Sequence, residues 1–337
     1  MSIRNLVAFC LLAVASRAAL PAQAAESRTL CVYDPAGRSG DFFAVMNRYA
    51  TAASAWGYDL DLKPYTDEET AAKDYEAGQC DGVTATGVRL QRFNRFPSTI
   101  EAIGGLTSYP MLKQMIGALT TSDAAAAKLT ANGNTTVGFI PVGAVYLFVR
   151  DRNVDTVGEL AGKRIATLAY DKPSLFMVER VGAIVVPADL GSLGPKFNNG
   201  DVDACYVSAP AYRPFELQRG LGTSGGIIRS PLAQATLQVM LRTDAFSGDF
   251  LKTSRRDLAG RFDEALKVVK KAESEIPAKY WVDVPAERQE GWSELFQGVR
   301  IALRDEKKAY AGSMLTVMRK LRCAADGARS ECAEKKE

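Results

Sequence analysis

Short apolar runs and amphipathic stretches alternate along most of the chain, and this alternation is typical of a parallel α/β sheet. The clearest unit comes first, where residues 29–33 predict a strand, residues 34–40 a loop and residues 41–56 a helix. Gly57 then stands where a helix commonly ends. The pattern therefore predicts strands joined by helices rather than a β-sandwich or a helical bundle.

The same alternation continues over the rest of the chain. The further predicted strands are residues 58–65, 81–85, 163–166, 183–186 and 204–208, and residues 135–150 carry strand segments interrupted by Pro141 and Gly143. The further predicted helices are residues 67–78, 109–130, 173–181, 189–197 and most of 256–323.

Two segments of the chain share one form, which predicts two lobes of similar construction. Residues 75–82 and 197–204 each run through a helix end, a glycine, two residues, an aspartate and a strand. Asp81 and Asp203 are therefore interpreted as structural turn residues rather than catalytic acids. The predicted divisions are a signal peptide at 1–24, lobe 1 at 25–145, lobe 2 at 146–240, C-terminal helices packing on the lobes at 241–323, and a flexible tail at 324–337.

The N-terminal residues predict export. Arg4 precedes an apolar run at residues 6–15, and small residues end at Ala24, where we expect cleavage of a secretory signal peptide. The apolar run is too short to anchor the chain across about 30 Å of hydrocarbon. Cys10 lies inside that run behind a bulky residue, which argues against a lipid anchor. The sequence thus predicts a mature protein that is soluble and exported, and the family resemblance given below implies the periplasm.

Composition and charge exclude several classes of function. The chain is 47% hydrophobic and 24% charged, which is typical of globular proteins. Loss of Arg4 and Arg17 with the signal leaves 40 basic against 39 acidic residues, so no nucleic-acid partner is predicted. The sequence has no histidine, which excludes Ser-His-Asp and Cys-His sites and histidine-ligated zinc. We predict no cofactor and no metal.

The cysteines predict disulfides, because an oxidising compartment lets disulfides persist. Cys323 and Cys332 lie close together after a long helical pattern, and Cys31 and Cys80 lie in or beside strands that the fold makes neighbours. Both pairs are predicted to be bonded. Cys205 lies in an apolar run and is interpreted as a small buried hydrophobic residue.

Loops that follow strands are the candidate binding positions, because ligands of open parallel sheets bind beyond the carboxyl ends of strands. The candidate ligand-binding residues are Asp34, Gly37, Arg38, Ser39, Thr86, Arg89, Tyr146, Tyr170, Asp171, Ser208 and Tyr212. Tyr206 joins the tyrosines of this set as a candidate for a cleft wall. The loop at 34–40 is read equally well as a glycine-rich turn with an exposed arginine, and each tyrosine alone is read as packing. Glu68 and Glu69 are interpreted as helix capping.

The export signal, the two lobes and two motifs together resemble a known family. Residues 159–165, Glu-Leu-Ala-Gly-Lys-Arg-Ile, and 200–204, Gly-Asp-Val-Asp-Ala, are similar to segments of type 2 periplasmic solute-binding proteins of TRAP transporters. Residues 31–37 and 78–82 are similar to a narrower group of solute-binding proteins, some of which are labelled efflux-associated or aminoglycoside-resistance proteins. The narrower resemblance extends over nearly all of the mature chain.

The resemblance implies a monomer of two α/β lobes with a hinge of crossing strands and C-terminal helices. It implies a small polar solute enclosed between the lobes and passed to membrane transporter subunits, without covalent chemistry. One position departs from the family pattern. TRAP receptors for organic acids carry a clamping arginine where this sequence has Ala166, and Arg164 comes too early. A carboxylate ligand is therefore not implied, unless Arg38 or Arg89 replaces the clamp.

The sequence leaves two other functions open. An enzyme such as a lyase or dehydratase on the same scaffold would need a titratable base, and a buried carboxylate in the cleft would mark it. An efflux accessory protein would need coiled-coil heptads and a membrane anchor, and neither is visible in the sequence.

Overall fold

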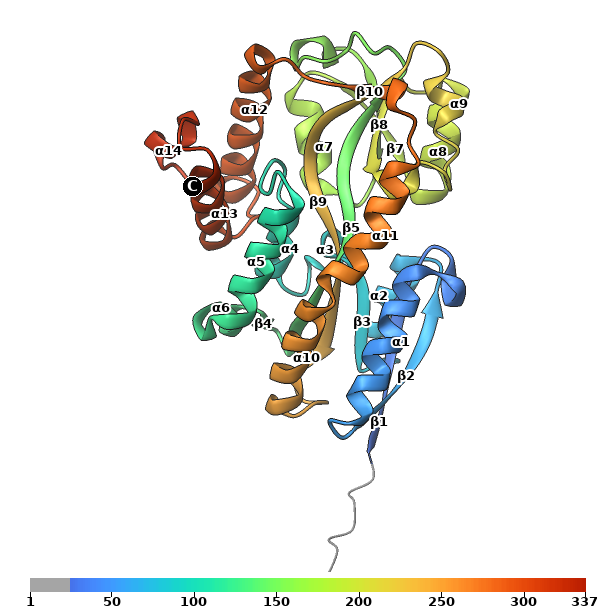
Figure 1. The fold of residues 1–337 in the computed structure, drawn as a ribbon, viewed down its shortest axis with the longest axis vertical. Coiled ribbons are helices and arrows are strands. Elements are labelled where there is room, and N and C mark those ends of the chain that lie inside the picture. The colour runs from blue at the N-terminus through green and yellow to red at the C-terminus, as the bar shows by residue number, and fades with distance from the viewer. Residues whose placement is uncertain (1–24) are drawn as a thin grey trace, which may run out of the picture.

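The computed structural model describes residues 25–337, so the predicted signal peptide lies outside the described residues. Ten strands form one sheet, in which eight follow the order β2-β1-β3-β9-β5-β8-β6-β7 (Figure 1). The strands are β1 (Glu26–Tyr33), β2 (Tyr58–Tyr65), β3 (Gly82–Thr86), β4 (Thr130–Ala131), β5 (Asn134–Val149), β6 (Arg164–Leu168), β7 (Ile184–Ala188), β8 (Ala204–Ser208), β9 (Gly226–Arg242) and β10 (Trp281–Val282). The helices are α1 (Asp41–Ser54), α2 (Glu68–Glu76), α3 (Gly87–Leu90), α4 (Arg95–Ser98), α5 (Tyr109–Thr121), α6 (Asp123–Lys128), α7 (Lys172–Arg180), α8 (Leu190–Asn199), α9 (Gln218–Leu221), α10 (Gly248–Gly260), α11 (Phe262–Ser274), α12 (Ala286–Asp305), α13 (Gly312–Ala325) and α14 (Ser330–Glu334).

The sheet has two parallel halves joined by long antiparallel strands, which agrees with the predicted two-lobed α/β fold. In lobe 1, β1 pairs in parallel with β2 and β3, and in lobe 2, β6 pairs in parallel with β7 and β8. The long strands β5 and β9 pair with each other and run through both lobes (Figure 1). Lobe 1 joins them through β3 and β9, and lobe 2 through β5 and β8.

The repeated motif has the same structural role in both lobes. The Asp81 carboxylate accepts a hydrogen bond from Thr29 N at 2.8 Å, and the Asp203 carboxylate accepts one from Arg164 N, also at 2.8 Å. The two aspartates also donate their own backbone N–H groups to Thr29 O and Arg164 O. Each aspartate therefore connects the residue before one strand to the backbone of the neighbouring parallel strand, as expected for turn residues.

The strand that joins the two lobes is absent from the sequence prediction. Residues 226–242 form β9, the neighbour of both β3 and β5. The predicted interruption at Pro141 and Gly143 is a bulge in a continuous strand, where the register with β9 shifts, and two further shifts lie at residues 136–138 and 145–147. Gly143 has a φ of 125°, and a Cβ atom there would lie 3.0 Å from Pro210 Cδ. Glycine is therefore required where β5 bends between the lobes.

Three apolar cores stabilise this arrangement. Phe43 and Phe250 belong to the core of lobe 1, and Phe197 belongs to the core of lobe 2. Phe296 and Met318 pack in a third core that includes side chains of α5, α12 and α13. Over residues 25–337, no helix has the length and hydropathy needed to cross a bilayer.

The C-terminal segment is folded, in contrast to the flexible tail expected at 324–337. The guanidinium groups of Arg300 and Arg322 are buried, and both bind the carboxylates of Glu331 and Glu337 at 2.6–3.0 Å. Arg300 also donates to Ile103 O and Arg322 to Gly105 O. The sequence expectation was wrong here because the charged tail finds partners on α12 and α13.

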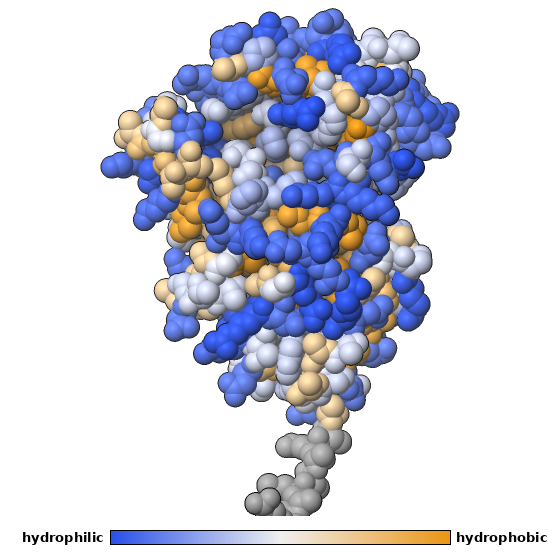
Figure 2. Space-filling view, in the orientation of Figure 1, coloured by the Kyte–Doolittle hydropathy of each residue, from blue (hydrophilic) through white to orange (hydrophobic). Residues whose placement is uncertain are grey.

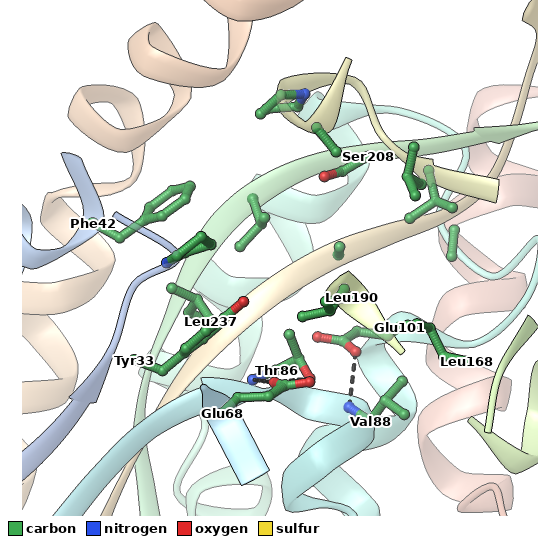
Figure 3. A pocket seen from close by; sticks show the side chains of 18 of the residues that line it. Tyr33, Phe42, Glu68, Thr86, Val88, Glu101, Leu168, Leu190, Ser208 and Leu237 are labelled. Atoms are coloured by element: carbon green, nitrogen blue, oxygen red, sulfur yellow. Dashed lines mark hydrogen bonds between the residues drawn. The ribbon is translucent and has the colours of Figure 1, made fainter. Parts of the chain in front are cut away.

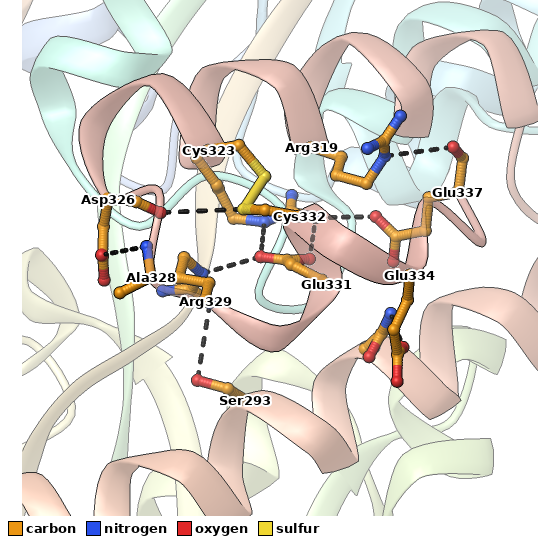
Figure 4. The surroundings of a disulfide bond; sticks show 12 residues. Ser293, Arg319, Cys323, Asp326, Ala328, Arg329, Glu331, Cys332, Glu334 and Glu337 are labelled. Atoms are coloured by element: carbon orange, nitrogen blue, oxygen red, sulfur yellow. Dashed lines mark hydrogen bonds and ion pairs between the residues drawn. A yellow bond between two sulfur atoms is a disulfide. The ribbon is translucent and has the colours of Figure 1, made fainter.

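Both predicted disulfides are present. Cys31 of β1 is bonded to Cys80, and Cys323 of α13 is bonded to Cys332 of α14, beside the buried arginine network (Figure 4). Cys205 is a free, fully buried thiol whose pKa is raised by burial, as expected for a small core residue.

Candidate ligand-binding cavity

A cavity of about 960 Å³ lies between the two lobes. Its walls come from loops after β1, β2 and β3 in lobe 1, from loops after β6 and β8 in lobe 2, from the hinge strands and from α11 (Figure 3). Most of the lining is apolar, and Figure 2 shows apolar residues in a recess at the middle of the molecule, framed by hydrophilic ones. Its apolar lining includes Phe42, Val88, Val145, Leu168, Met177, Leu190, Phe215, Leu232 and Leu237.

Asp34 follows β1 and holds the start of α1. Its carboxylate accepts hydrogen bonds from Ala36 N at 2.8 Å and from Phe42 N and Phe43 N at 3.0 Å each. Gly40 leaves room for that carboxylate, because a Cβ atom there would lie 1.9 Å from Asp34 Oδ1. The carboxylate thus satisfies backbone N–H groups that a helix end otherwise leaves free.

Glu101 is a buried carboxylate that joins lobe 1 to strand β9. Its oxygens accept hydrogen bonds from Val88 N at 3.0 Å (Figure 3), from Gly87 N at 3.0 Å, and from the backbone and hydroxyl of Thr236 at 2.9 and 2.6 Å. Burial raises the pKa of Glu101 to about 7, against the lowering effect of these donors. This residue fulfils the buried-carboxylate criterion for an enzyme, yet both oxygens are engaged by protein donors. Its position is better explained by a structural role, in which it connects lobe 1 to β9.

Tyr170 connects the two lobes across the cleft. Its hydroxyl donates a hydrogen bond to Glu68 on α2 at 2.5 Å, and its ring lies under the Arg89 guanidinium at 3.7 Å. Glu68 is 1% exposed and also accepts from Thr86 N and Thr86 Oγ1. Burial, followed by the Glu68 charge, raises the pKa of the Tyr170 hydroxyl, so it remains a donor.

Asp171 and Tyr206 supply polar groups on the lobe 2 side of the cavity. The Asp171 carboxylate accepts a hydrogen bond from Ser174 N at 3.1 Å and begins α7. Burial raises the pKa of Asp171, and burial together with the Asp171 charge raises the pKa of Tyr206. The Tyr206 side chain comes from β8, and its hydroxyl has no hydrogen-bond partner among residues 25–337.

The structure places the sequence candidates in two groups. Six of them line the cavity: Asp34, Ser39, Thr86, Tyr170, Asp171 and Ser208. The cavity lining does not include the other five: Gly37, Arg38, Arg89, Tyr146 and Tyr212. Arg38 is exposed and stacks on Phe43, while Tyr146 donates to Glu273 on α11 at 2.8 Å. Gly37 shapes the turn after β1 with a φ of 60°, and Tyr212 is buried in the core of lobe 2.

The sequence reasoning missed the polar groups that come from distant elements. The sequence interpretation of Glu68 as a helix-capping residue leaves out its place in the cavity wall, and no sequence pattern near Glu101 or in α11 marks either as part of the cavity. The sequence does contain a signal that could have placed Glu68 in the cavity wall. Glu68 is an acid in the first turn of α2, and that turn follows β2 at the same sheet edge as the other candidates.

No arginine side chain takes the position of a carboxylate clamp in the cavity walls over the described chain. Ala166 is fully buried, and Arg164 is exposed and paired with Asp203 at 2.9 Å. Arg38 lies outside the walls, and Arg89 is engaged with Tyr170 and lies 3.8 Å from Glu68.

Two lobes with crossing strands and an enclosed cavity define the fold of TRAP-type periplasmic solute-binding proteins. A TRAP protein of Rhodobacter sphaeroides in an apo open form has a TM-score of 0.70 at 12% identity, covering 88% of this chain and 99% of that chain. A TRAP protein of Rhodoferax ferrireducens with bound malonate has a TM-score of 0.68 at 14% identity, covering 88% and 98%.

The sequence then identifies the family within this fold. The family model described as "Solute-binding protein AdeT 1/2" matches residues 45–337. The Acinetobacter baumannii protein named "Probable solute-binding protein AdeT1" is 36% identical over 304 residues, 90% of this chain and 99% of that protein. A second A. baumannii protein, "Probable solute-binding protein AdeT2", is 27% identical over 58% of this chain and 82% of its own length. The chain belongs to the AdeT 1/2 family of solute-binding proteins, as its motifs predicted.

Proposed function

We propose that the protein is an exported receptor that encloses one small solute between its lobes and delivers it to a membrane transporter. The observation that carries this proposal is the cavity of about 960 Å³, whose walls come from both lobes, the hinge strands and α11. A ligand in this space contacts both lobes at once, so binding favours the closed arrangement.

Export, cleavage after Ala24 and action as a monomer in the periplasm are parts of the same proposal. The N-terminal pattern of charge, apolar run and small residues supports export. Two disulfides in the folded chain agree with an oxidising compartment. Related TRAP proteins carry bound malonate, succinate or galacturonate, which supports a small solute as the partner.

A ligand screen tests the receptor function. We expect the melting temperature of residues 25–337 to rise by several degrees with one class among amines, amino acids, organic acids, sugars and aminoglycosides, since a ligand at about 100 times its dissociation constant adds about 2.7 kcal/mol. Small-angle scattering with that ligand should show a smaller radius of gyration, and mass spectrometry should recover the ligand unchanged. A chemically altered ligand would favour an enzyme, and silence across the whole panel would contradict the receptor function.

A further inference from the structure

Several backbone N–H groups at the cavity wall are bound by the protein's own carboxylates. Asp34 accepts from the first turn of α1, Glu101 accepts from Gly87 N and Val88 N, and Asp171 accepts from the first turn of α7. Free N–H groups at such positions are the usual hydrogen-bond donors to an anionic ligand. Here an anionic solute would have to displace these internal carboxylates or lie beside them.

The charged side chains in the walls are predominantly acidic. The charged lining residues are Asp34, Asp41, Glu68, Glu101, Asp171, Glu275, Lys267 and Lys271. Four of the six carboxylates are buried, whereas both lysines are exposed on α11. Arg89 offsets Glu68 only in part, because its Nε lies 3.8 Å from Glu68 Oε1. Like charges in a low-dielectric space repel strongly, so the interior disfavours a carboxylate and favours a cation.

Two groups on the lobe 2 wall are available to a ligand. Asp171 accepts one backbone hydrogen bond, whereas Asp34 accepts three and Glu101 accepts four from its neighbours. Tyr206 is 6% exposed and lines the cavity, and its hydroxyl makes no hydrogen bond of good geometry within the described chain, although the side chains of Ser174 and Thr167 lie close to it. A buried hydroxyl without a partner is costly unless a ligand supplies one. The surrounding wall is apolar, with Leu168 and Met177 on the same lobe.

Building on the proposed receptor function, we propose that the solute is a small amine with an apolar body, whose ammonium group pairs with Asp171 and donates a hydrogen bond to the Tyr206 hydroxyl. The apolar body occupies the remaining wall, where its burial adds favourable free energy in proportion to its area. The two lysines of α11 are exposed, so solvent screens their charges more than those of the buried acids.

Three probes that share one apolar body test the charge preference. Calorimetric titration of residues 25–337 at pH 7.5 with 3-phenylpropylamine, 3-phenylpropanoate and 3-phenylpropan-1-ol compares a cation, an anion and a neutral molecule of similar size. We expect the amine to bind at least about tenfold more tightly than the carboxylate, with the alcohol between them. Equal or tighter binding of the carboxylate, or binding of none of the three, would overturn the proposed ligand class.

Matched variants locate the contact. Asp171→Asn keeps a good helix cap but loses the charge, and we expect about tenfold or greater loss of amine affinity with no loss of carboxylate affinity. Asp189→Asn is the control, because Asp189 caps α8 in the same way but is exposed and does not line the cavity. Tyr206→Phe preserves the ring and should weaken the amine severalfold, which gives a second test if Asp171→Asn does not fold. Unchanged amine affinity in both variants would refute the contact.

The two proposals fail in different ways. If organic acids bind, close the lobes and are recovered unchanged, the receptor function stands and the amine inference is wrong. If no solute of any charge binds or closes the lobes, the receptor function itself fails.

Discussion

The buried charges near the C-terminus determine the pKa of Glu331 and, through it, how the stability of the protein depends on pH. Burial alone would raise the pKa of Glu331, but hydrogen bonds and charges from Arg322, Arg300 and Arg329 outweigh it and lower this pKa to about 2. An acid whose pKa is lowered in the folded state stabilises the fold above its unfolded value, about 4.5, and loses this contribution as pH falls toward 2.

Glu331→Gln should therefore change the acid sensitivity of the protein. We expect the wild type to lose about 3 kcal/mol of unfolding free energy between pH 5 and pH 2 through this group, and the variant to lack that loss while being less stable at pH 6. Urea unfolding at pH 6, 4 and 3 measures both effects. Glu294→Gln, on the exposed side of α12, is the control and should follow the wild type. Parallel pH curves for the wild type and Glu331→Gln would contradict this account.

The place of a single residue was predictable where it depends only on the rule that ligands of open sheets bind beyond the carboxyl ends of strands. Asp34 and Asp171 follow strands, and the rule for open sheets correctly puts them at the cavity wall. Their roles as helix caps were not visible in the pattern. Glu101 and Glu331 could not be found from sequence, because their partners Thr236 and Arg300 lie far along the chain.

At the scale of elements, the bend of β5 depends on one glycine. Gly143 has a φ of 125°, which side chains rarely adopt, and it packs against Pro210. We expect Gly143→Ala to lower the unfolding free energy by about 1–3 kcal/mol, measured by urea unfolding. Gly117→Ala is the matched control, since Gly117 lies inside α5 with no atom within 4 Å of its added Cβ. That substitution should stabilise the protein by up to about 1 kcal/mol. A stable Gly143→Ala protein would show that the bend tolerates a side chain.

Strands that adjoin a glycine or an aspartate typical of an element boundary were predicted well, whereas the central strand β9 was not predicted. The predicted strands at 58–65 and 204–208 coincide with β2 and β8, where glycine and aspartate mark the ends. β9 contains Arg229 and Pro231 within its apolar run, which breaks the pattern. This segment forms a strand because it pairs with β3 on one side and β5 on the other, and a single sequence does not show that pairing.

For the whole molecule, the contact of Tyr170 with Glu68 joins the two lobes, and we expect it to stabilise the closed arrangement of the proposed receptor. Tyr170→Phe removes a hydrogen bond to a buried carboxylate, worth about 1.5–3 kcal/mol, so the ratio of closed to open protein should fall by about tenfold or more. We expect a larger radius of gyration without ligand and weaker apparent binding. Tyr65→Phe is the control, because the Tyr65 hydroxyl bonds Asp74 within lobe 1. Identical scattering curves for wild type and Tyr170→Phe would rule out this contact as a latch.

The two-lobed plan was foreseeable from the repeated motif, and the position of the cavity followed from the strand order. The charge of the cavity was not foreseeable, because α11 and the segment around Glu101 reach it through tertiary packing alone.

The crossing strands also determine when the chain can fold. Gly82 of β3 pairs with Leu241 of β9, so lobe 1 lacks the inner neighbour of its sheet until nearly all of lobe 2 has been synthesised. Contacts between such distant residues slow folding. A chain ending before residue 226 would expose the edge of β3, an aggregation hazard. On the export route proposed above, this delay would be an advantage, because the N-terminal half would not form a stable lobe before it has crossed the membrane.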